Sequence, residues 1–182
     1  MSQGPKTSLT HRLLVDFLPD EAVSLDGVIG MCSAPGIKDP DAPDGPWDRD
    51  LDADLKRLRD RYHIDILVTL LERGQYVSDE LAALGIPDLL VRAQRMGLGT
   101  DWSPMPDGGV PVSLDQLTKL VERIVLAVRR GKAVVLHCRA GFGRTGLVAA
   151  CCLAALGASV DEALATVRAT RPGTVETPAQ LQ

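Results

Sequence analysis

The sequence predicts a three-layer α/β domain, in which a central, mostly parallel sheet of about five strands is flanked by helices. The first observation behind this prediction is an alternation of short apolar runs with segments whose aliphatic residues recur at helical spacing. The second is composition: aromatic residues make up only 3% of the 182 residues, so Leu, Val, Ile and Ala must form the core. That mixture suits a buried parallel sheet covered by helices.

Five segments have the character of strands. Residues 13–17 alternate apolar and polar side chains, a pattern typical of an edge strand. Residues 27–32 and 132–137 are short apolar runs, and residues 64–71 are apolar and β-branched, which indicates a strand buried on both faces. Residues 98–102 predict a further short strand. Ligands of such sheets bind beyond the carboxyl ends of the strands, where the segment after residue 137 lies.

Four segments have the character of helices, and a fifth is helical or irregular. Residues 48–60 carry leucines at helical spacing, and residues 72–96 are helical or irregular with glycine and proline breaks. A Ser-x-x-Gln capping box opens a helix at residue 113, which a glycine ends at residue 131. A third helix starts at Arg144, and a Ser-x-x-Glu box at residue 159 opens a last one that reaches about residue 170.

Length and polarity define the domain organisation. We expect residues 1–182 to form one domain, with the polar residues 1–10 as a flexible tail. The first ten residues lack the apolar segment of a signal peptide, and no apolar stretch approaches the roughly 20 residues of a membrane span. The net charge is −4 without a polybasic run, which argues against nucleic-acid binding. We therefore expect a monomer that binds neither membrane nor nucleic acid.

The four cysteines have neither the spacing of a disulfide framework nor that of a zinc site. They are Cys32, Cys138, Cys151 and Cys152. Reduced thiols are typical of the cytosol, so we expect a cytoplasmic protein with no metal and no other cofactor.

The segment between the strand at 132–137 and the following helix has the pattern of an anion site. Cys138 opens it, Arg144 closes it, and between them stand Arg139, Ala140, Gly141, Phe142 and Gly143. The glycines allow backbone angles that turn successive amides inward, and inward amides at a helix N-terminus form a nest for an anion. The same field stabilises a thiolate. We therefore predict that Cys138 attacks phosphorus and that the planar fork of Arg144 holds two phosphate oxygens.

The alternative interpretation of this segment is structural. Cys138 would then be a buried core thiol and Arg144 a surface charge at the start of a helix. Two glycines directly after a strand, at residues 141 and 143, are difficult to explain by packing alone. The segment is not a Walker A loop, because no Gly-Lys-Ser/Thr occurs in it.

Residues 137–146 resemble the His-Cys-x5-Arg-Thr-Gly signature of the protein tyrosine and dual-specificity phosphatases. From about residue 28 to residue 180 the chain is most similar to the kinase-associated phosphatases that act on cyclin-dependent kinases. Gly-Met-Cys-Ser-Ala-Pro-Gly at 30–36, Glu-Arg-Gly at 72–74 and Pro-Asp-Gly-Gly at 106–109 support that closer match. The resemblance implies a dual-specificity phosphatase-like fold. It also implies a hydrolase of phosphotyrosine, phosphoserine or phosphothreonine in proteins that works through a phosphocysteine intermediate.

The resemblance assigns the general acid to Asp107, which lies in a Pro/Gly/Asp-rich loop at 103–111. The neighbouring glycines would allow this loop to close over substrate. The alternative is a plain turn aspartate, which an Asp-Gly pair favours. Asp101 is the reserve candidate for the acid.

Further residues receive supporting roles. The Thr145 hydroxyl would donate to the Cys138 sulfur as it leaves the phosphoenzyme, although Thr is also common at a helix start. Gln180 matches a position at which related enzymes hold the hydrolytic water. Arg139 is the one other loop side chain that could bind substrate, and His137 is interpreted as a structural residue that orients the loop.

Three competing functions stay open from the sequence. The substrate could be a small-molecule phosphate monoester rather than a phosphoprotein. The chain could be a phosphate-binding module without turnover, although intact Cys138, Arg144 and Asp107 argue against that. A rhodanese-like sulfur transferase also uses a cysteine loop, but it needs neither Asp107 nor Thr145.

Cys32 is interpreted as a small core residue, with a redox disulfide to Cys138 as the alternative.

Overall fold

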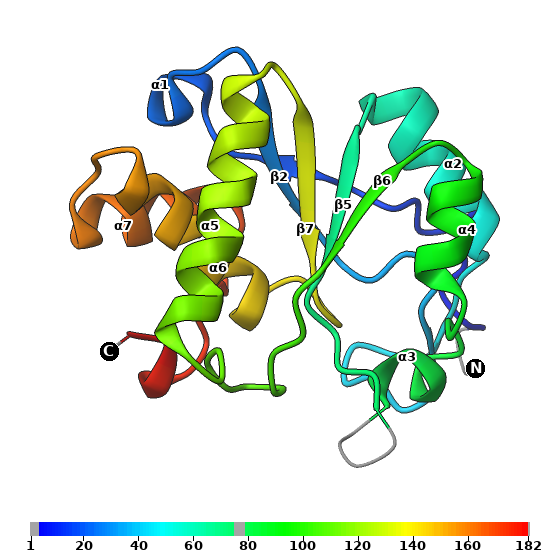
Figure 1. Cartoon of the computed structure of the whole chain (residues 1–182). Helices are drawn as coiled ribbons and strands as arrows, with labels where there is room; N and C mark the ends of the chain where they lie inside the picture. The colour runs from blue at the N-terminus through cyan, green and yellow to red at the C-terminus, as the bar shows by residue number, and fades with distance from the viewer. Residues whose placement is uncertain (1–3, 75–78, 182) are drawn as a thin grey trace.

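The computed structural model describes residues 4–74 and 79–181. Five strands form one sheet in the order β1-β2-β7-β5-β6 (Figure 1). Strand β1 pairs antiparallel with β2, and the other neighbouring strands are parallel. Their bounds are Asp16–Phe17 (β1), Val28–Cys32 (β2), Ile66–Thr69 (β5), Gly99–Trp102 (β6) and Ala133–His137 (β7). The predicted mostly parallel sheet of about five strands is thus confirmed.

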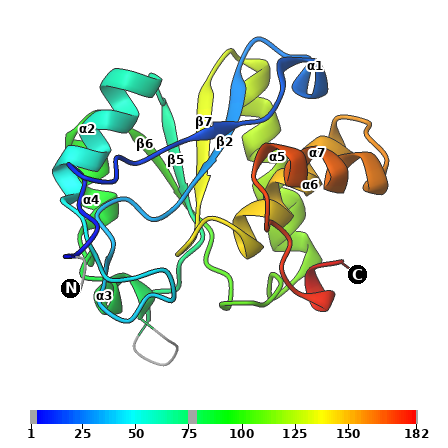
Figure 2. The same cartoon turned by 180° about the vertical axis from the view of Figure 1, so that it is seen from behind.

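Helices cover both faces of this sheet (Figures 1 and 2). One face carries α5 (Leu114–Arg129), α6 (Gly143–Ala155) and α7 (Val160–Thr170), and the other carries α2 (Leu51–Tyr62), α3 (Glu80–Ala83) and α4 (Leu89–Arg95). Shorter elements are α1 (Asp20–Val23), a two-stranded ribbon of β3 (Lys38–Asp39) and β4 (Trp47–Asp48), and a 3-10 turn, η1 (Pro178–Leu181). Within the described residues, no helix has the length and apolar character needed to cross a membrane.

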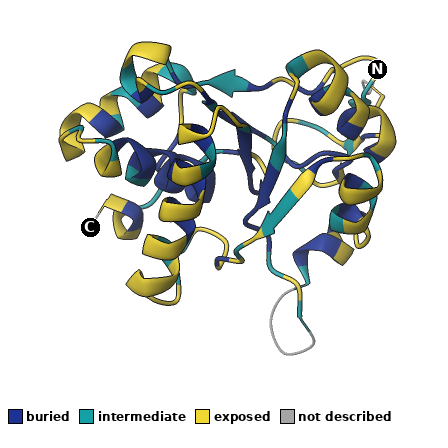
Figure 3. Cartoon of the chain, turned by 45° about the horizontal axis from the view of Figure 1, so that its top comes forward, coloured by how far each residue is buried: buried dark blue, intermediate teal, exposed yellow. Residues whose placement is uncertain are grey.

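The core lies in two layers, because side chains alternate across the strands. Val134 and Leu136 of β7 pack on the α5–α6 side, whereas Val135 packs with Leu67 on the α2–α4 side. Figure 3 shows the buried central strands between helices whose outer faces are exposed, while the edge strand β6 is partly exposed. Burial on both faces explains why the central strands are apolar without interruption.

Both predicted serine caps hold, while some elements are shorter than expected. Ser113 accepts a hydrogen bond from Gln116 N, and Ser159 and Glu162 form a reciprocal capping box. Helix α2 begins at Leu51 rather than at residue 48, because the Asp50 side chain caps it. Strand β1 covers only the last two residues of the predicted 13–17. Leu13 and Val15 pack in the core without joining the ladder, and Leu14 is exposed.

The described part of the N-terminal segment lies against the β3–β4 ribbon. We expected residues 1–10 to be a flexible tail, and residues 1–3 lie outside the described part of the chain. Lys6 bridges to Trp47 and pairs with Asp44 at 2.7 Å. Ser8 Oγ accepts a hydrogen bond from Asp50 N at 2.9 Å. These contacts attach residues 6–8 to the domain.

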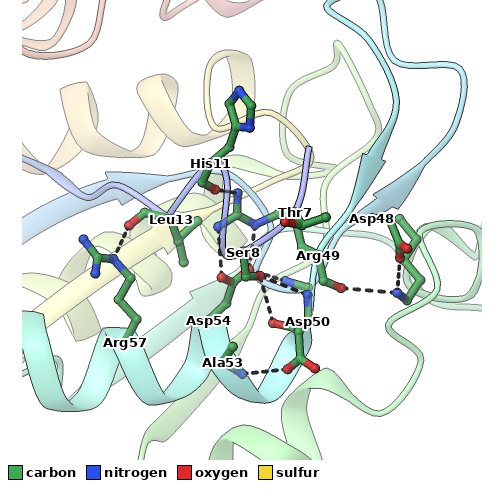
Figure 4. Close-up of polar contacts among 12 residues, drawn as sticks. Thr7, Ser8, His11, Leu13, Asp48, Arg49, Asp50, Ala53, Asp54 and Arg57 are labelled. Atoms are coloured by element: carbon green, nitrogen blue, oxygen red, sulfur yellow. Dashed lines mark hydrogen bonds and ion pairs between the residues drawn. The ribbon is translucent and has the colours of Figure 1, made fainter. Parts of the chain in front are cut away.

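A buried ion pair joins three segments on the α2 side of the sheet (Figure 4). Arg49 Nε and Nη2 donate to the two carboxylate oxygens of Asp54 at 2.7 and 2.9 Å, and both side chains are at most 2% exposed. Asp54 also accepts from Gly36 N, and Arg49 Nη1 donates to His11 O. The pair therefore connects the N-terminal segment, the loop after β2 and helix α2.

This geometry predicts a large cost for removing one partner. Asp54→Ala leaves the Arg49 charge buried without a carboxylate, which should lower the free energy of unfolding by about 3–5 kcal/mol. Asp52→Ala on the same helix is the matched control, since Asp52 is 52% exposed in its pair with Arg92 and should cost less than about 1 kcal/mol. Urea unfolding measures both variants. Equal effects would show that the buried pair contributes no more than a surface one.

Candidate active site

The cysteine loop, residues 138–144, follows β7 directly and leads into α6. Strand β7 lies between β2 and β5, and His137 is in register with both Cys32 and Thr69. Cys138 itself is 4% exposed. The loop therefore lies at the carboxyl end of the central strand, where sheets of this kind bind ligands.

Donors outside the loop hold four of its consecutive carbonyl groups. The Cys138 carbonyl accepts from His137 Nδ1 at 3.1 Å, and the Arg139 carbonyl accepts from Ala34 N at 2.9 Å. Arg171, just after α7, donates from Nη2 to Ala140 O and from Nε to Gly141 O, both at 2.8 Å.

The orientation of these carbonyls fixes the orientation of the amides. In a trans peptide the C=O and the following N–H point in opposite directions, and no described peptide bond is cis. The N–H groups of residues 139–142 therefore point away from the outer donors. Within the described residues none of these four N–H groups donates a hydrogen bond. Four free amides turned to one side suit a tetrahedral oxyanion.

Gly141 makes the bend of the loop possible. Its φ of +81° lies in the region that favours glycine, and a Cβ at this position would lie 2.3 Å from Cys32 O. The loop therefore passes too close to the end of β2 for any side chain at residue 141.

His137 orients the start of the loop as a neutral ring. It is fully buried, and Nδ1 must carry the proton because its partner, the Cys138 carbonyl, can only accept. Nε2 then accepts from the Thr69 hydroxyl at 2.8 Å. Burial lowers the pKa of His137 to about 4, so the ring stays neutral near pH 7. These contacts agree with the structural role expected of it.

Arg144 is 1% exposed and is held by Glu80. Its Nη1 and Nη2 donate to the two carboxylate oxygens of Glu80 at 2.6 and 2.9 Å, and Nη1 also donates to Met105 O at 3.0 Å. Burial opposes the charge, but Glu80 and the nearby Cys138 and Asp107 outweigh it and raise the pKa of Arg144. The sequence analysis missed Glu80. A buried arginine implies a carboxylate partner, but nothing local selects one of the 24 acidic residues.

Asp107 contacts the same guanidinium. Its Oδ1 accepts from Arg144 Nη2 at 2.8 Å, while most of its side chain, 62%, is exposed. The reserve candidate, Asp101, lies on β6 and pairs with Arg123 at 2.6 Å instead. The structure thus brings Asp107, and not Asp101, to the cysteine loop.

The C-terminal turn holds the loop that carries Asp107. Thr177 Oγ1 donates to Gly108 O and Gln180 Nε2 donates to Gly109 O, both at 3.1 Å. Gln180 is 5% exposed, and its amide would lie within 2.9 Å of a Cβ at residue 143. Gln180 therefore lies between the cysteine loop and the Asp107 loop.

Thr145 and Arg139 differ in whether their polar groups have a partner. Thr145 is buried, and its hydroxyl has no hydrogen-bond partner in the described part of the chain. Arg139 Nε donates to Asp39 Oδ2 at 3.0 Å, and the two side chains form an ion pair. The cation predicted to bind substrate is thus already neutralised by a carboxylate of the protein.

Cys32 lies beside the loop but faces the other layer. It is fully buried with the α2–α4 core, whereas Cys138 packs with the α5–α6 core. Burial raises the pKa of Cys32 to about 12, and both cysteines are free thiols. These surroundings fit a small core residue better than a disulfide partner.

Comparison with known proteins places this geometry in a family. The family model for cyclin-dependent kinase inhibitor 3 (CDKN3) matches residues 5–166. Cyclin-dependent kinase inhibitor 3 of Rattus norvegicus is 30% identical over 166 residues, which cover 90% of this chain and 73% of that protein. The Homo sapiens protein of the same name is 28% identical over 166 residues, with the same coverage of 90% and 73%.

Solved structures agree with this assignment. A kinase-associated phosphatase with its catalytic-site cysteine replaced by serine superimposes with a TM-score of 0.81 at 26% identity, covering 99% of this chain and 92% of that one. Tk-PTP in its active form gives 0.66 at 27% identity, covering 92% and 90%. The chain therefore belongs to the cyclin-dependent kinase inhibitor 3 family and has the fold of the dual-specificity phosphatases.

Proposed function

We propose that this chain is a cysteine-dependent phosphatase of phosphoproteins. The observation that carries the proposal is the loop geometry: outer donors hold the carbonyls of residues 138–141, and the amides of residues 139–142 have no acceptor within the described residues, with Cys138 at one end of the loop and Arg144 at the other. A phosphate monoester dianion matches that site in charge and in the number of its acceptors. Its relatives support the reaction class, since a similar structure is that of a kinase-associated phosphatase with a catalytic cysteine.

The proposed first step forms a phosphocysteine. The Cys138 thiolate attacks phosphorus, the S–P bond forms and the P–O bond to the leaving group breaks. Asp107 transfers its proton to the leaving oxygen, and Arg144 together with the loop amides stabilises the charge on the equatorial oxygens. Because Asp107 contacts Arg144, an arriving phosphate must share or replace that contact.

The proposed second step releases phosphate. Water attacks phosphorus, its proton passes to the Asp107 carboxylate, and the S–P bond breaks to regenerate the thiolate. Gln180, between the two loops, is suited to orient this water. The buried Thr145 hydroxyl, which lacks another partner among the described residues, would donate to the departing sulfur. The residues of this scheme need neither a metal nor an organic cofactor.

A cavity beside the loop supports a polypeptide substrate over a small molecule. Its volume is about 460 Å³, and Arg139, Ala140 and Phe142 of the loop form one side. The apolar part of the lining includes Leu13, Leu14, Ile37, Pro43 and Trp47. Three of the four arginines in its wall are already paired, Arg139 with Asp39, Arg171 with Asp16 and Arg49 with Asp54, and only Arg12 has no acidic partner among the described residues. Such a surface suits an apolar side chain next to the phosphorylated residue rather than a second phosphate.

Free thiols also support the cytoplasm as the compartment.

Replacing the nucleophile tests the mechanism. Cys138→Ser should abolish hydrolysis of p-nitrophenyl phosphate, because a serine hydroxyl is not ionised near pH 7, while inorganic phosphate or tungstate should still bind. Steady-state kinetics and calorimetry measure the two properties, with Cys151→Ser as the control. Retention of more than a few per cent of activity would exclude the covalent step on Cys138.

The leaving group tests the general acid. Asp107→Asn should slow hydrolysis of phenyl phosphate by about 10²–10⁴-fold, but that of p-nitrophenyl phosphate far less, because nitrophenolate leaves without a proton. The alkaline limb of the pH–rate profile for phenyl phosphate should also disappear. Asp101→Asn is the matched control. Equal effects on both esters would move the acid to another residue.

Phosphopeptides test the substrate class. A peptide with Leu beside the phosphorylated residue should be hydrolysed with a kcat/KM about tenfold above that of its Ala counterpart, on the scale of apolar pocket contacts. Leu14→Ser should reduce this preference, whereas Leu9→Ser should not, since both leucines are exposed but only Leu14 borders the cavity. No preference at any flanking position would favour a small-molecule phosphate as substrate.

A further inference from the structure

We propose that Arg171 is a positioning residue for the anion site, and that Asp16 holds it in place. This inference rests on the proposed function, because it concerns how the cysteine loop keeps its amides turned to a phosphate. Arg171 lies outside the His-Cys-x5-Arg-Thr-Gly signature, directly after the last residue of α7.

Arg171 binds two carbonyl groups of the cysteine loop. Nη2 and Nε reach Ala140 O and Gly141 O at the same distance, 2.8 Å. These are adjacent carbonyls, so a single planar guanidinium fixes two successive peptide planes. Because each peptide is trans, the N–H groups of Gly141 and Phe142 are fixed on the opposite side. Half of the four free amides of the site thus depend on one side chain.

No donor other than Arg171 reaches Ala140 O or Gly141 O in the part of the chain that the structure describes. Cys138 O and Arg139 O, by contrast, are held by His137 and by the backbone of Ala34, both parts of the sheet or its immediate extension. The middle of the loop contains a glycine with φ of +81°, a residue with few intrinsic restraints on its peptide planes. Without Arg171 these two peptides would be free to rotate and turn their carbonyls toward the anion.

Arg171 is itself restrained by an ion pair with Asp16 and by the ring of Phe142. Nη1 donates to Asp16 Oδ2 at 2.5 Å, on the antiparallel edge strand β1, seen beside β2 in Figure 2. The guanidinium lies over the Phe142 ring, 4.7 Å from its centroid. The side chain is only 14% exposed. A long cation restrained in this way loses little additional freedom when the loop binds its ligand.

Oxyanion binding tests the role independently of turnover. Arg171→Met keeps the apolar stem and removes the donors, so the affinity for tungstate, measured by calorimetry, should fall about 10- to 100-fold, the range expected for losing charged hydrogen bonds. Arg171→Lys should recover only part of it, because one ammonium cannot span two carbonyls and Asp16. Asp16→Asn should give a smaller loss, since the donors remain while their anchor weakens.

Arg168, in the last turn of α7, offers a matched control three residues before Arg171. It also donates to two backbone carbonyls, those of Thr174 and Val175, but neither belongs to the cysteine loop. Arg168→Met should leave tungstate affinity within about threefold of wild type. It should lower thermal stability about as much as Arg171→Met does. A purely structural role of Arg171 would make the two variants alike. The pH dependence of Cys138 alkylation by iodoacetamide is a second readout, and it should shift to higher pH only in Arg171→Met.

The outcomes separate this inference from the proposed function. Wild-type protein that binds tungstate but hydrolyses no phosphate ester would contradict the phosphatase, while the Arg171 comparison still decides the positioning role. Wild-type affinity in Arg171→Met, or an equal loss in Arg168→Met, would overturn the role of Arg171. Protein that binds no oxyanion at all would overturn both.

Discussion

The carbonyl groups of residues 138–141 all point outward because each accepts a hydrogen bond from a donor outside the anion site. A peptide group has two polar ends, and holding one end decides where the other points. The amides of the candidate anion site are therefore oriented by donors that bind the carbonyls on the opposite side of the loop. The donors come from β7, from the segment after β2 and from the end of α7, so the sheet order and the packing of α7 both determine whether the amides converge.

Two ion pairs in the described part of the chain are buried on both sides, and they have different consequences. Arg49 and Asp54 join segments of the α2 side, where the pair is enclosed by protein and serves the architecture. Arg144 and Glu80 are nearly as buried, but Arg144 also contacts the exposed Asp107. Glu80 thus fixes the guanidinium before any ligand arrives, which reduces the ordering that binding would otherwise require. A carboxylate 64 positions away in the chain keeps this arginine ready for an anion.

The sequence predicted what depends on local pattern. Alternating apolar runs, two serine caps and the glycines of the cysteine loop all act through neighbours along the chain, and the structure agrees with them. Glu80 and Arg171 escaped notice because their partners are remote and their surroundings in sequence are those of ordinary surface residues. Arg139 was predicted as a side chain that could bind substrate, and its pairing with Asp39 was not foreseen because it follows from the fold and not from its neighbours. The choice of Asp107 over Asp101 came from a family resemblance. Spacing alone does not reveal that Asp101 forms an ion pair with Arg123.

The link from Asp16 through Arg171 to the cysteine loop has a consequence for the growing chain. On the ribosome, Cys138 emerges before Arg171. Asp16 of strand β1 is made early and has no Arg171 to pair with until synthesis is nearly finished. The loop cannot acquire its full set of outward hydrogen bonds until both ends of this link have emerged and joined. The anion site around Cys138 is therefore incomplete while the chain is still partly folded on the ribosome. It forms only when the whole domain has folded.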